Sequence, residues 1–207
     1  MANLKDIRDR IKSVKSIQQV TKAMKMVAAA KMRKAQENME KARPYSKKIS
    51  DLVNTFLLDE ENHSLPEVKV RDNINNVLFI IVTSDRGMAG AFNANVIKEA
   101  EQSVNTFGRE KSCLICVGKK SHDYFKRRDY NILDYYRDFW NTLNIDVALK
   151  IGENIVSKFI SKDIDSVDVI YNEFINIARQ RIECKPFLPI TYDVEDKPPC
   201  NLLYEPS

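Results

Sequence analysis

Hydrophobic residues recur at helical spacing through the first fifty-odd residues of the chain. The first of them follow one another at steps of three, four and three residues, which is the narrow apolar stripe of a coiled-coil seam. These seam residues are Leu4, Ile7, Ile11 and Val14. Small or flexible side chains, alanine and methionine among them, continue the stripe toward Phe56, and only Pro44 interrupts it. The pattern predicts a long helix with a kink or an end at the proline.

Such a helix is too long to lie on one small domain. As a single helix, residues 3–57 would measure about 80 Å at roughly 1.5 Å per residue. A compact domain of about 130 residues spans only about 30 to 40 Å. We therefore expect much of the helix to project away from the rest of the chain and to need at least one partner helix over its seam. The alternative is a helix that packs wholly on its own domain.

After a polar stretch the pattern changes to short apolar runs that alternate with amphipathic segments. Val77–Val82 is a continuous β-branched and apolar run, typical of a strand buried on both faces of a sheet. Further strands are expected at 113–118, 130–136, 166–176 and 180–190, with helices ending near 107 and spanning 119–129 and 145–161. Because strand and helix alternate, we expect an α/β, Rossmann-like domain with a mostly parallel, doubly wound sheet and an antiparallel pair at its end.

The predicted organisation is therefore a long basic helix at 1–58, a linker at 59–74 and the sheet domain at 75–207. Charge separates the two ends of this arrangement. Residues 1–48 hold 14 Lys and Arg against 4 Asp and Glu, whereas the rest of the chain holds 19 against 25. The basic arm points to an acidic partner, which is a nucleic acid, an anionic membrane or an acidic protein surface.

The composition narrows the class of protein further. No apolar run approaches the roughly 18 residues of a membrane span, so we expect a soluble chain. The first residues lack the apolar core of a signal peptide. The four cysteines fit reduced thiols in a cytosolic compartment better than a disulfide framework, which belongs to short secreted chains.

No set of residues in the sequence forms a convincing active site. The turn TSDRGMAGAFN lacks the third glycine of a dinucleotide-binding fingerprint, so we assign Gly87 and Gly90 to a tight turn that lets a helix approach a strand. VGKKS is no P-loop, because Lys120 stands where Ser or Thr is required. Cys113 and Cys116 lie three residues apart on a strand and therefore face opposite sides of the sheet. We expect no catalytic residue, no metal ligand and no cofactor.

Two stretches resemble the gamma subunit of the rotary, F-type ATP synthase. They are NLKDIRDRIKSVKSIQQVTKAMKMVAAAKMRKAQ near the N-terminus and TSDRGMAGAFNANV in the sheet domain, and the closing LLYEPS is also similar to that family. The resemblance covers essentially the whole chain, and its first stretch is long and highly specific. Ala89 stands where the family usually has a cysteine.

The resemblance implies a central-stalk subunit that performs no chemistry itself. In this family the N-terminal helix pairs with a C-terminal helix to form a bent shaft, whose rotation couples proton flow through the membrane ring to ATP synthesis on the beta subunits. By resemblance, the residues expected to contact beta are Met24, Lys25, Lys31, Arg33 and Lys34. The foot residues expected to contact the epsilon subunit or the c-ring are Arg43, Tyr45, Tyr204 and Glu205.

The resemblance also implies partners and a location. The expected partners are the alpha, beta and epsilon subunits and the c-ring, with no nucleic acid and with membrane contact only through the complex. The cysteine-bearing insertion of chloroplast gamma subunits is absent, which favours the cytoplasmic side of a bacterial inner membrane. Family members continue past a YEPS-like stretch into the second long helix, whereas this chain stops at Ser207. We therefore expect it to lack the main partner of its seam.

The alternative function is nucleic-acid binding through the basic arm. Against it, the arm has no aromatic residue before Tyr45 on which a base could stack. Its apolar seam also calls for a protein partner.

Overall fold

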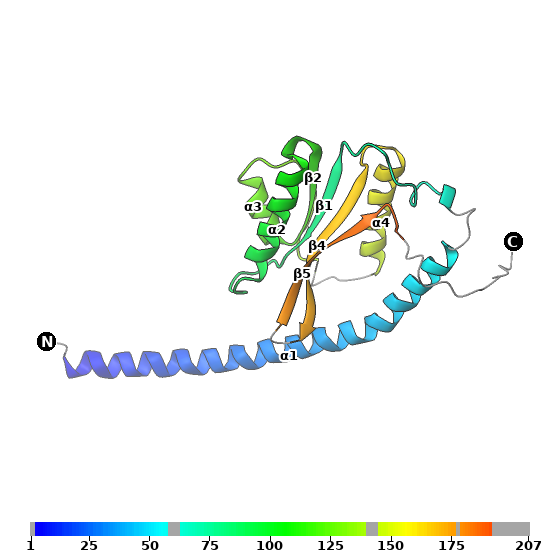
Figure 1. Ribbon diagram of the computed structural model, residues 1–207. Coiled ribbons are helices and arrows are strands. Elements are labelled where there is room, and N and C mark those ends of the chain that lie inside the picture. Colours follow the sequence, from blue (N-terminus) through cyan, green and yellow to red (C-terminus); the bar gives the residue numbers. More distant parts are fainter. Residues whose placement is uncertain (1–2, 58–62, 140–144, 177–178, 192–207) are drawn as a thin grey trace. The chain divides into compact units, whose positions relative to one another are not determined.

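The computed structural model describes residues 3–57, 63–139, 145–176 and 179–191. The chain divides into two compact units, Met1–Phe56 and Leu57–Ser207. The first is a long helix, and the second is a five-stranded sheet flanked by helices (Figure 1). The predicted fold class, an α/β chain with a long N-terminal helix and a mostly parallel sheet, is confirmed.

Helix α1 runs from Leu4 to Phe56 and contains 53 residues. The backbone N–H of Asn3 donates a hydrogen bond to Asp6 Oδ2 at 3.3 Å, and the Asp6 carboxylate lies in the first turn, where the helix dipole favours negative charge. Pro44 lies inside the helix, which continues for about three more turns, so the proline does not end it. None of the α1 residues is buried.

The sheet has the strand order β3-β2-β1-β4-β5. The strands are β1 Val77–Val82, β2 Ser112–Val117, β3 Ile132–Tyr136, β4 Ser166–Asn176 and β5 Arg179–Leu188. The pairs β1–β2, β2–β3 and β1–β4 are parallel, and β5 pairs antiparallel with β4. The chain moves outward from β1 to β3 and then returns to the other side of β1, which is the predicted doubly wound arrangement with an antiparallel pair at the end.

Helices cover both faces of the sheet (Figure 1). Helices α2, Phe92–Phe107, and α3, Lys119–Lys126, lie on one face, and α4, Ile145–Ile160, lies on the other. Successive side chains of a strand point to opposite faces, so an apolar strand such as β1 feeds two cores. Phe79 belongs to the core under α2 and α3, and Leu78 to the core under α4, and both are fully buried.

An ion pair fastens the segment that precedes β1. Arg71 Nη1 lies 2.6 Å from Asp165 Oδ1, and Arg71 Nη2 donates to the carbonyl oxygen of Phe159 at the end of α4. The other Asp165 oxygen accepts the N–H groups of Asn75 and Asn76 at 2.9 and 3.0 Å. Burial tends to raise the pKa of Asp165, but the hydrogen bonds from Arg71, Asn76 and Asn75 outweigh it and hold the pKa below its usual value. Part of the predicted linker is thus fixed to the sheet domain.

Candidate partner-binding helix

The seam residues at the start of α1 are uncovered. The exposed fractions are 72% for Leu4, 47% for Ile7, 51% for Ile11 and 58% for Val14. Spacings of three and four residues put these side chains on one face of the helix. Burying one such side chain fully is worth about 1.5 to 3 kcal/mol, so a row of four provides a strong driving force for binding an apolar surface.

Beyond Val14 the apolar face turns around the helix. Each residue of an α-helix is rotated by about 100° from the one before, so Ile17 lies about 60° and Val20 about 120° around from Val14. Met24 and Val27 continue in this new direction, and all four of these side chains are exposed. The helix therefore presents two apolar faces in succession along its length.

The helix brings together only some of the five residues predicted to contact beta. Lys31 comes seven residues after Met24 and lies about 20° around from it, and Lys34 lies about 80° around. Lys25 and Arg33 lie about 100° and 180° away from Met24. Met24 is 66% exposed and shares its side of α1 with Lys31 and Lys34. Contact of this group with a beta subunit stays a prediction.

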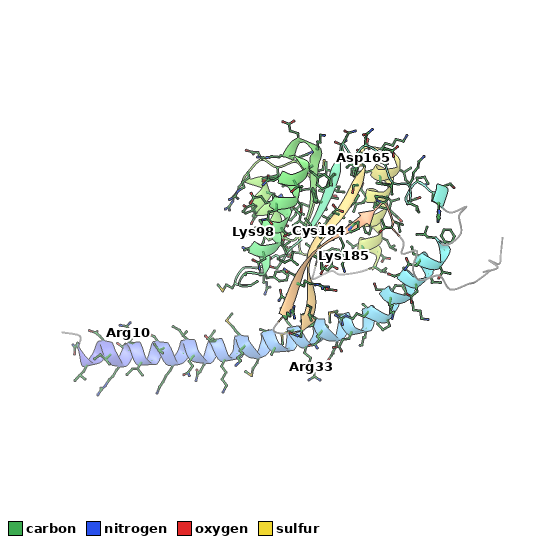
Figure 2. The ribbon with its side chains drawn as sticks, in the orientation of Figure 1. Arg10, Arg33, Lys98, Asp165, Cys184 and Lys185 are labelled. Carbon is green, nitrogen blue, oxygen red and sulfur yellow. The ribbon has the colours of Figure 1, made fainter. Side chains whose placement is uncertain are left out.

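Arg33 already has a partner within α1. Its Nε lies 3.1 Å from Glu37 Oε1, one turn further along. The two side chains are 84% and 52% exposed, so the pair is worth only about 0.3 to 0.5 kcal/mol. The stretch 10–36 contains no Asp or Glu, and Figure 2 shows Arg10 and Arg33 leaving the helix on different sides. Positive charge therefore surrounds the middle of α1 instead of marking one face.

Two of the four predicted foot residues lie on α1. Arg43 and Tyr45 flank Pro44 and are exposed, Tyr45 by 65%. Tyr204 and Glu205 lie outside the described residues. The structure thus places half of the predicted foot and leaves its contacts as a prediction.

The start of α3 is where a phosphate would bind if VGKKS were a P-loop. Its first three amides already have partners in the turn after β1. Lys119 N–H donates to Asp85 Oδ1 at 2.9 Å, Lys120 N–H to Ser84 O at 3.2 Å and Ser121 N–H to Thr83 Oγ1 at 3.0 Å. The residues of this turn cap α3, and the amides that would hold an anion are taken.

The close approach between this turn and α3 occurs at Gly118. Gly118 has φ of +102°, and a Cβ there would overlap the carbonyl oxygen of Thr83. Gly90 has φ of +56° and does supply a turn, but nothing lies within 4 Å of the position of its Cβ. Around Gly87 the nearest atoms belong to the flexible side chain of Lys120, at 3.5 and 3.6 Å. The expectation that Gly87 and Gly90 allow the close approach is therefore wrong, and the turn at Gly90 is as predicted.

The two cysteines of β2 face opposite sides of the sheet, as predicted. Cys116 belongs to the core under α2 and α3, and Cys113 packs against the core under α4. Burial raises the pKa of Cys116 to about 12, so this thiol stays protonated at neutral pH and is a poor nucleophile.

Two further properties bear on the kind of site that the chain can form. Among the described residues, no group of three or more His, Cys, Asp or Glu is arranged to hold a metal ion. None of the helices in the described ranges combines the length and the apolar character needed to cross a membrane.

Comparisons with known proteins identify the family. A family model described as ATP synthase matches residues 3–207. The ATP synthase gamma chain of Prosthecochloris aestuarii is 42% identical over 213 residues, which cover 100% of this chain and 73% of that protein. The chain belongs to the ATP synthase gamma chain family. The gamma chain of Chloroherpeton thalassium is 40% identical over 226 residues, covering 100% of this chain and 74% of the relative.

A solved structure has the same fold. The chain matches one chain in the structure of the central stalk and c-ring of the Tetrahymena thermophila mitochondrial ATP synthase, with a TM-score of 0.63 and 26% identity, covering 82% of this chain and 72% of that one. The central-stalk role implied by the resemblance to gamma chains is confirmed. The nucleic-acid-binding alternative is not supported.

Proposed function

We propose that α1 forms one half of the rotor shaft of a proton-translocating ATP synthase. Its rotation would couple proton flow through the membrane ring to ATP synthesis on the beta subunits. In this proposal the chain acts through its contact surfaces and supplies no group to the chemical step.

The row of uncovered apolar side chains at the start of α1 carries the proposal. Leu4, Ile7, Ile11 and Val14 have the spacing of a coiled-coil seam, and each has about half or more of its surface exposed. A helix of 53 residues without a buried position is not stabilised by packing within its own unit. Most helical stability in proteins comes from packing an apolar face, so α1 needs a partner helix along this row.

The other contacts of α1 are assigned by their chemistry. The second apolar face carries Met24, and Lys31 and Lys34 on the same side favour an acidic surface, which we assign to the beta subunits. Arg43 and Tyr45 would contribute to a foot on the epsilon subunit or the c-ring. The alpha subunits would be further partners in the same complex. The complex would place the chain peripherally on the cytoplasmic side of a bacterial membrane.

Co-purification with the alpha and beta subunits tests the proposal. The chain is coexpressed with its own alpha and beta subunits and isolated through an affinity tag on beta. We expect Ile11→Asp to lower the recovery of the chain by about tenfold or more, because a carboxylate would be buried in the seam without a partner.

Gln19→Asp is the matched control. Gln19 is exposed and lies about 80° around the helix from Ile11 and about 100° from Val20, so the same charge is placed outside both apolar faces. This variant should be recovered like the unmodified chain. Equal recovery of Ile11→Asp and the unmodified chain would contradict the proposal.

A further inference from the structure

Two arginines of the sheet domain are stacked on tyrosine rings. Arg109 lies in the short helix η2, Arg109–Lys111, between α2 and β2, and its guanidinium carbon is 4.1 Å from the ring centroid of Tyr130. Arg128 follows α3, and its guanidinium carbon is 3.7 Å from the ring centroid of Tyr124. Arg109 Nη2 also donates a hydrogen bond to the carbonyl oxygen of Arg128. This hydrogen bond joins two segments nineteen residues apart, each of which carries one of the stacked arginines.

The tyrosine rings are themselves held in place by Glu101 of α2. Tyr124 Oη donates to Glu101 Oε2 at 3.2 Å, and Tyr130 Oη donates to Glu101 Oε1 at 3.4 Å. Burial and the nearby Glu101 carboxylate raise the pKa of both phenols, so the phenols stay protonated and remain donors. The Glu101 oxygens are therefore engaged by neutral hydroxyl groups, and the rings form fixed platforms for the arginines.

Neither of the two stacked guanidinium groups takes part in an ion pair, since among the described residues no carboxylate lies within ion-pair distance of Arg109 or Arg128. Both arginines are exposed, as are Lys111 and Lys126. A guanidinium group offers a planar fork of N–H donors that matches a carboxylate, and holding it on a ring lowers the entropy lost on binding.

We propose that Arg109 and Arg128 form a binding site for the carboxylates of an acidic segment on another subunit of the complex. This inference rests on the proposed function in one respect, because the acidic segment is assigned to another subunit of the ATP synthase. Arginine and tyrosine are the residues enriched at the energetic centres of protein–protein interfaces. Phe107, 43% exposed and two residues before Arg109, adds apolar surface of the kind that a protein partner covers.

A lipid surface fits this site less well than a protein does. Attraction to anionic lipid grows with the number of uncompensated cations. The surface around the two arginines carries five cations interspersed with three carboxylates. The carboxylates lower the net charge and leave the two stacked guanidinium groups in place. The five cations are Arg109, Lys111, Lys126, Arg127 and Arg128, and the three carboxylates are Glu101, Glu110 and Asp129.

Zero-length carbodiimide crosslinking of the assembled complex tests this inference. The reagent activates a carboxyl group, and a lysine amine in contact with that group attacks it to form an amide while the reagent leaves as a urea. Lys111 and Lys126 supply such amines beside the two arginines. We expect crosslinks from one or both lysines to an acidic segment of another subunit. In R109Q/R128Q their yield should fall by about tenfold or more, because the partner's carboxylates lose their charged hydrogen bonds.

Two further variants separate binding from folding and from net charge. R109K/R128K keeps both charges but not the planar fork, and it should also lower the yield. K98Q/K150Q removes the same number of charges from exposed positions on α2 and α4 and should leave the yield unchanged. Thermal unfolding of each variant identifies any loss that comes from misfolding.

Three results would overturn the inference. The first is crosslinking of Lys111 and Lys126 only to carboxylates of this chain, and the second is an unchanged yield in both arginine variants. The third is sedimentation with vesicles of phosphatidylcholine and phosphatidylglycerol that depends on both arginines, in the absence of crosslinks to other subunits. Co-purification with alpha and beta does not depend on these results, so the inference can fail while the proposed function stands.

Discussion

Helix α1 and the sheet domain use the same types of apolar residue in opposite ways. In the sheet domain Phe79, Phe125 and Phe159 have no exposed surface, because helices of the same unit close both faces of the sheet. In α1, by contrast, the apolar row that begins at Leu4 is exposed along its length. One chain thus encodes two kinds of hydrophobic pattern: the first stabilises its own fold, and the second becomes stabilising only when another surface covers it.

The largest expected effect comes from truncating one apolar side chain in each region. Phe79→Ala removes a fully buried ring and should lower the free energy of unfolding of the sheet domain by about 3 to 5 kcal/mol. Ile11→Ala removes an exposed side chain and should change the stability of the isolated chain by no more than about 0.5 kcal/mol. Urea unfolding measures the change in stability of both variants, and hydrogen exchange of the β1 and β2 amides provides an independent measurement for the sheet domain. Similar losses in the two variants would remove the distinction between the regions.

A glycine pair sharpens the contrast within the sheet domain. Gly118→Ala would force a Cβ onto the Thr83 carbonyl at φ of +102°, and overpacking together with backbone strain should cost about 2 to 4 kcal/mol. Gly152→Ala adds a Cβ to α4 where nothing lies within 4 Å, and higher helix propensity should stabilise it by about 0.5 to 1 kcal/mol. Thermal unfolding of the two variants should therefore shift in opposite directions. A stable Gly118→Ala variant would show that the turn after β1 moves easily.

The smallest effect concerns the ion pair before β1 and depends on pH. Asp165 has a pKa below its usual value, so the stability that it provides is complete above about pH 3.9, the pKa of an unfolded aspartate, and is lost as the pH falls through the lower folded value. Asp165→Asn should cost about 1.5 to 3 kcal/mol at neutral pH. The gap between the variant and the unmodified protein should shrink below about pH 4 in urea unfolding curves. Asp129→Asn, at an exposed site, is the control, and a gap that does not vary with pH would contradict the assignment.

Elements with their own local pattern could be predicted from the sequence. Val77–Val82 reads as a buried strand because all six residues are apolar, and the structure has a strand at the same bounds. The seam of α1 could also be predicted, because the spacing of its apolar residues along the sequence does not depend on which surface covers them. Whether Pro44 kinks the helix or ends it could not be decided, because the apolar spacing resumes beyond the proline in either case.

Features that depend on contacts between distant residues could not be predicted. Arg71 and Asp165 are 94 residues apart, and neither has a local pattern that marks it as half of an ion pair. The close contact at Gly118 arises only when the turn after β1 meets the start of α3. From the sequence alone, the close approach is therefore assigned to the glycines of TSDRGMAGAFN, which stand in a visible turn motif. The stacking of Arg109 on Tyr130 likewise joins two segments whose sequences show ordinary surface charge.

The contacts of Arg71 with Asp165 and Phe159 affect how the sheet domain responds to tension applied to the chain before residue 71. Tension applied upstream of residue 71 meets this side chain before it meets β1. Arg71 passes the load to the end of α4 and, through Asp165, to the entrance of β4, so two layers of the domain share it. Force would reach β1 only after the contacts of Arg71 had broken. The hydrogen bonds between β1 and its parallel neighbours would therefore be protected at the first residue of the strand.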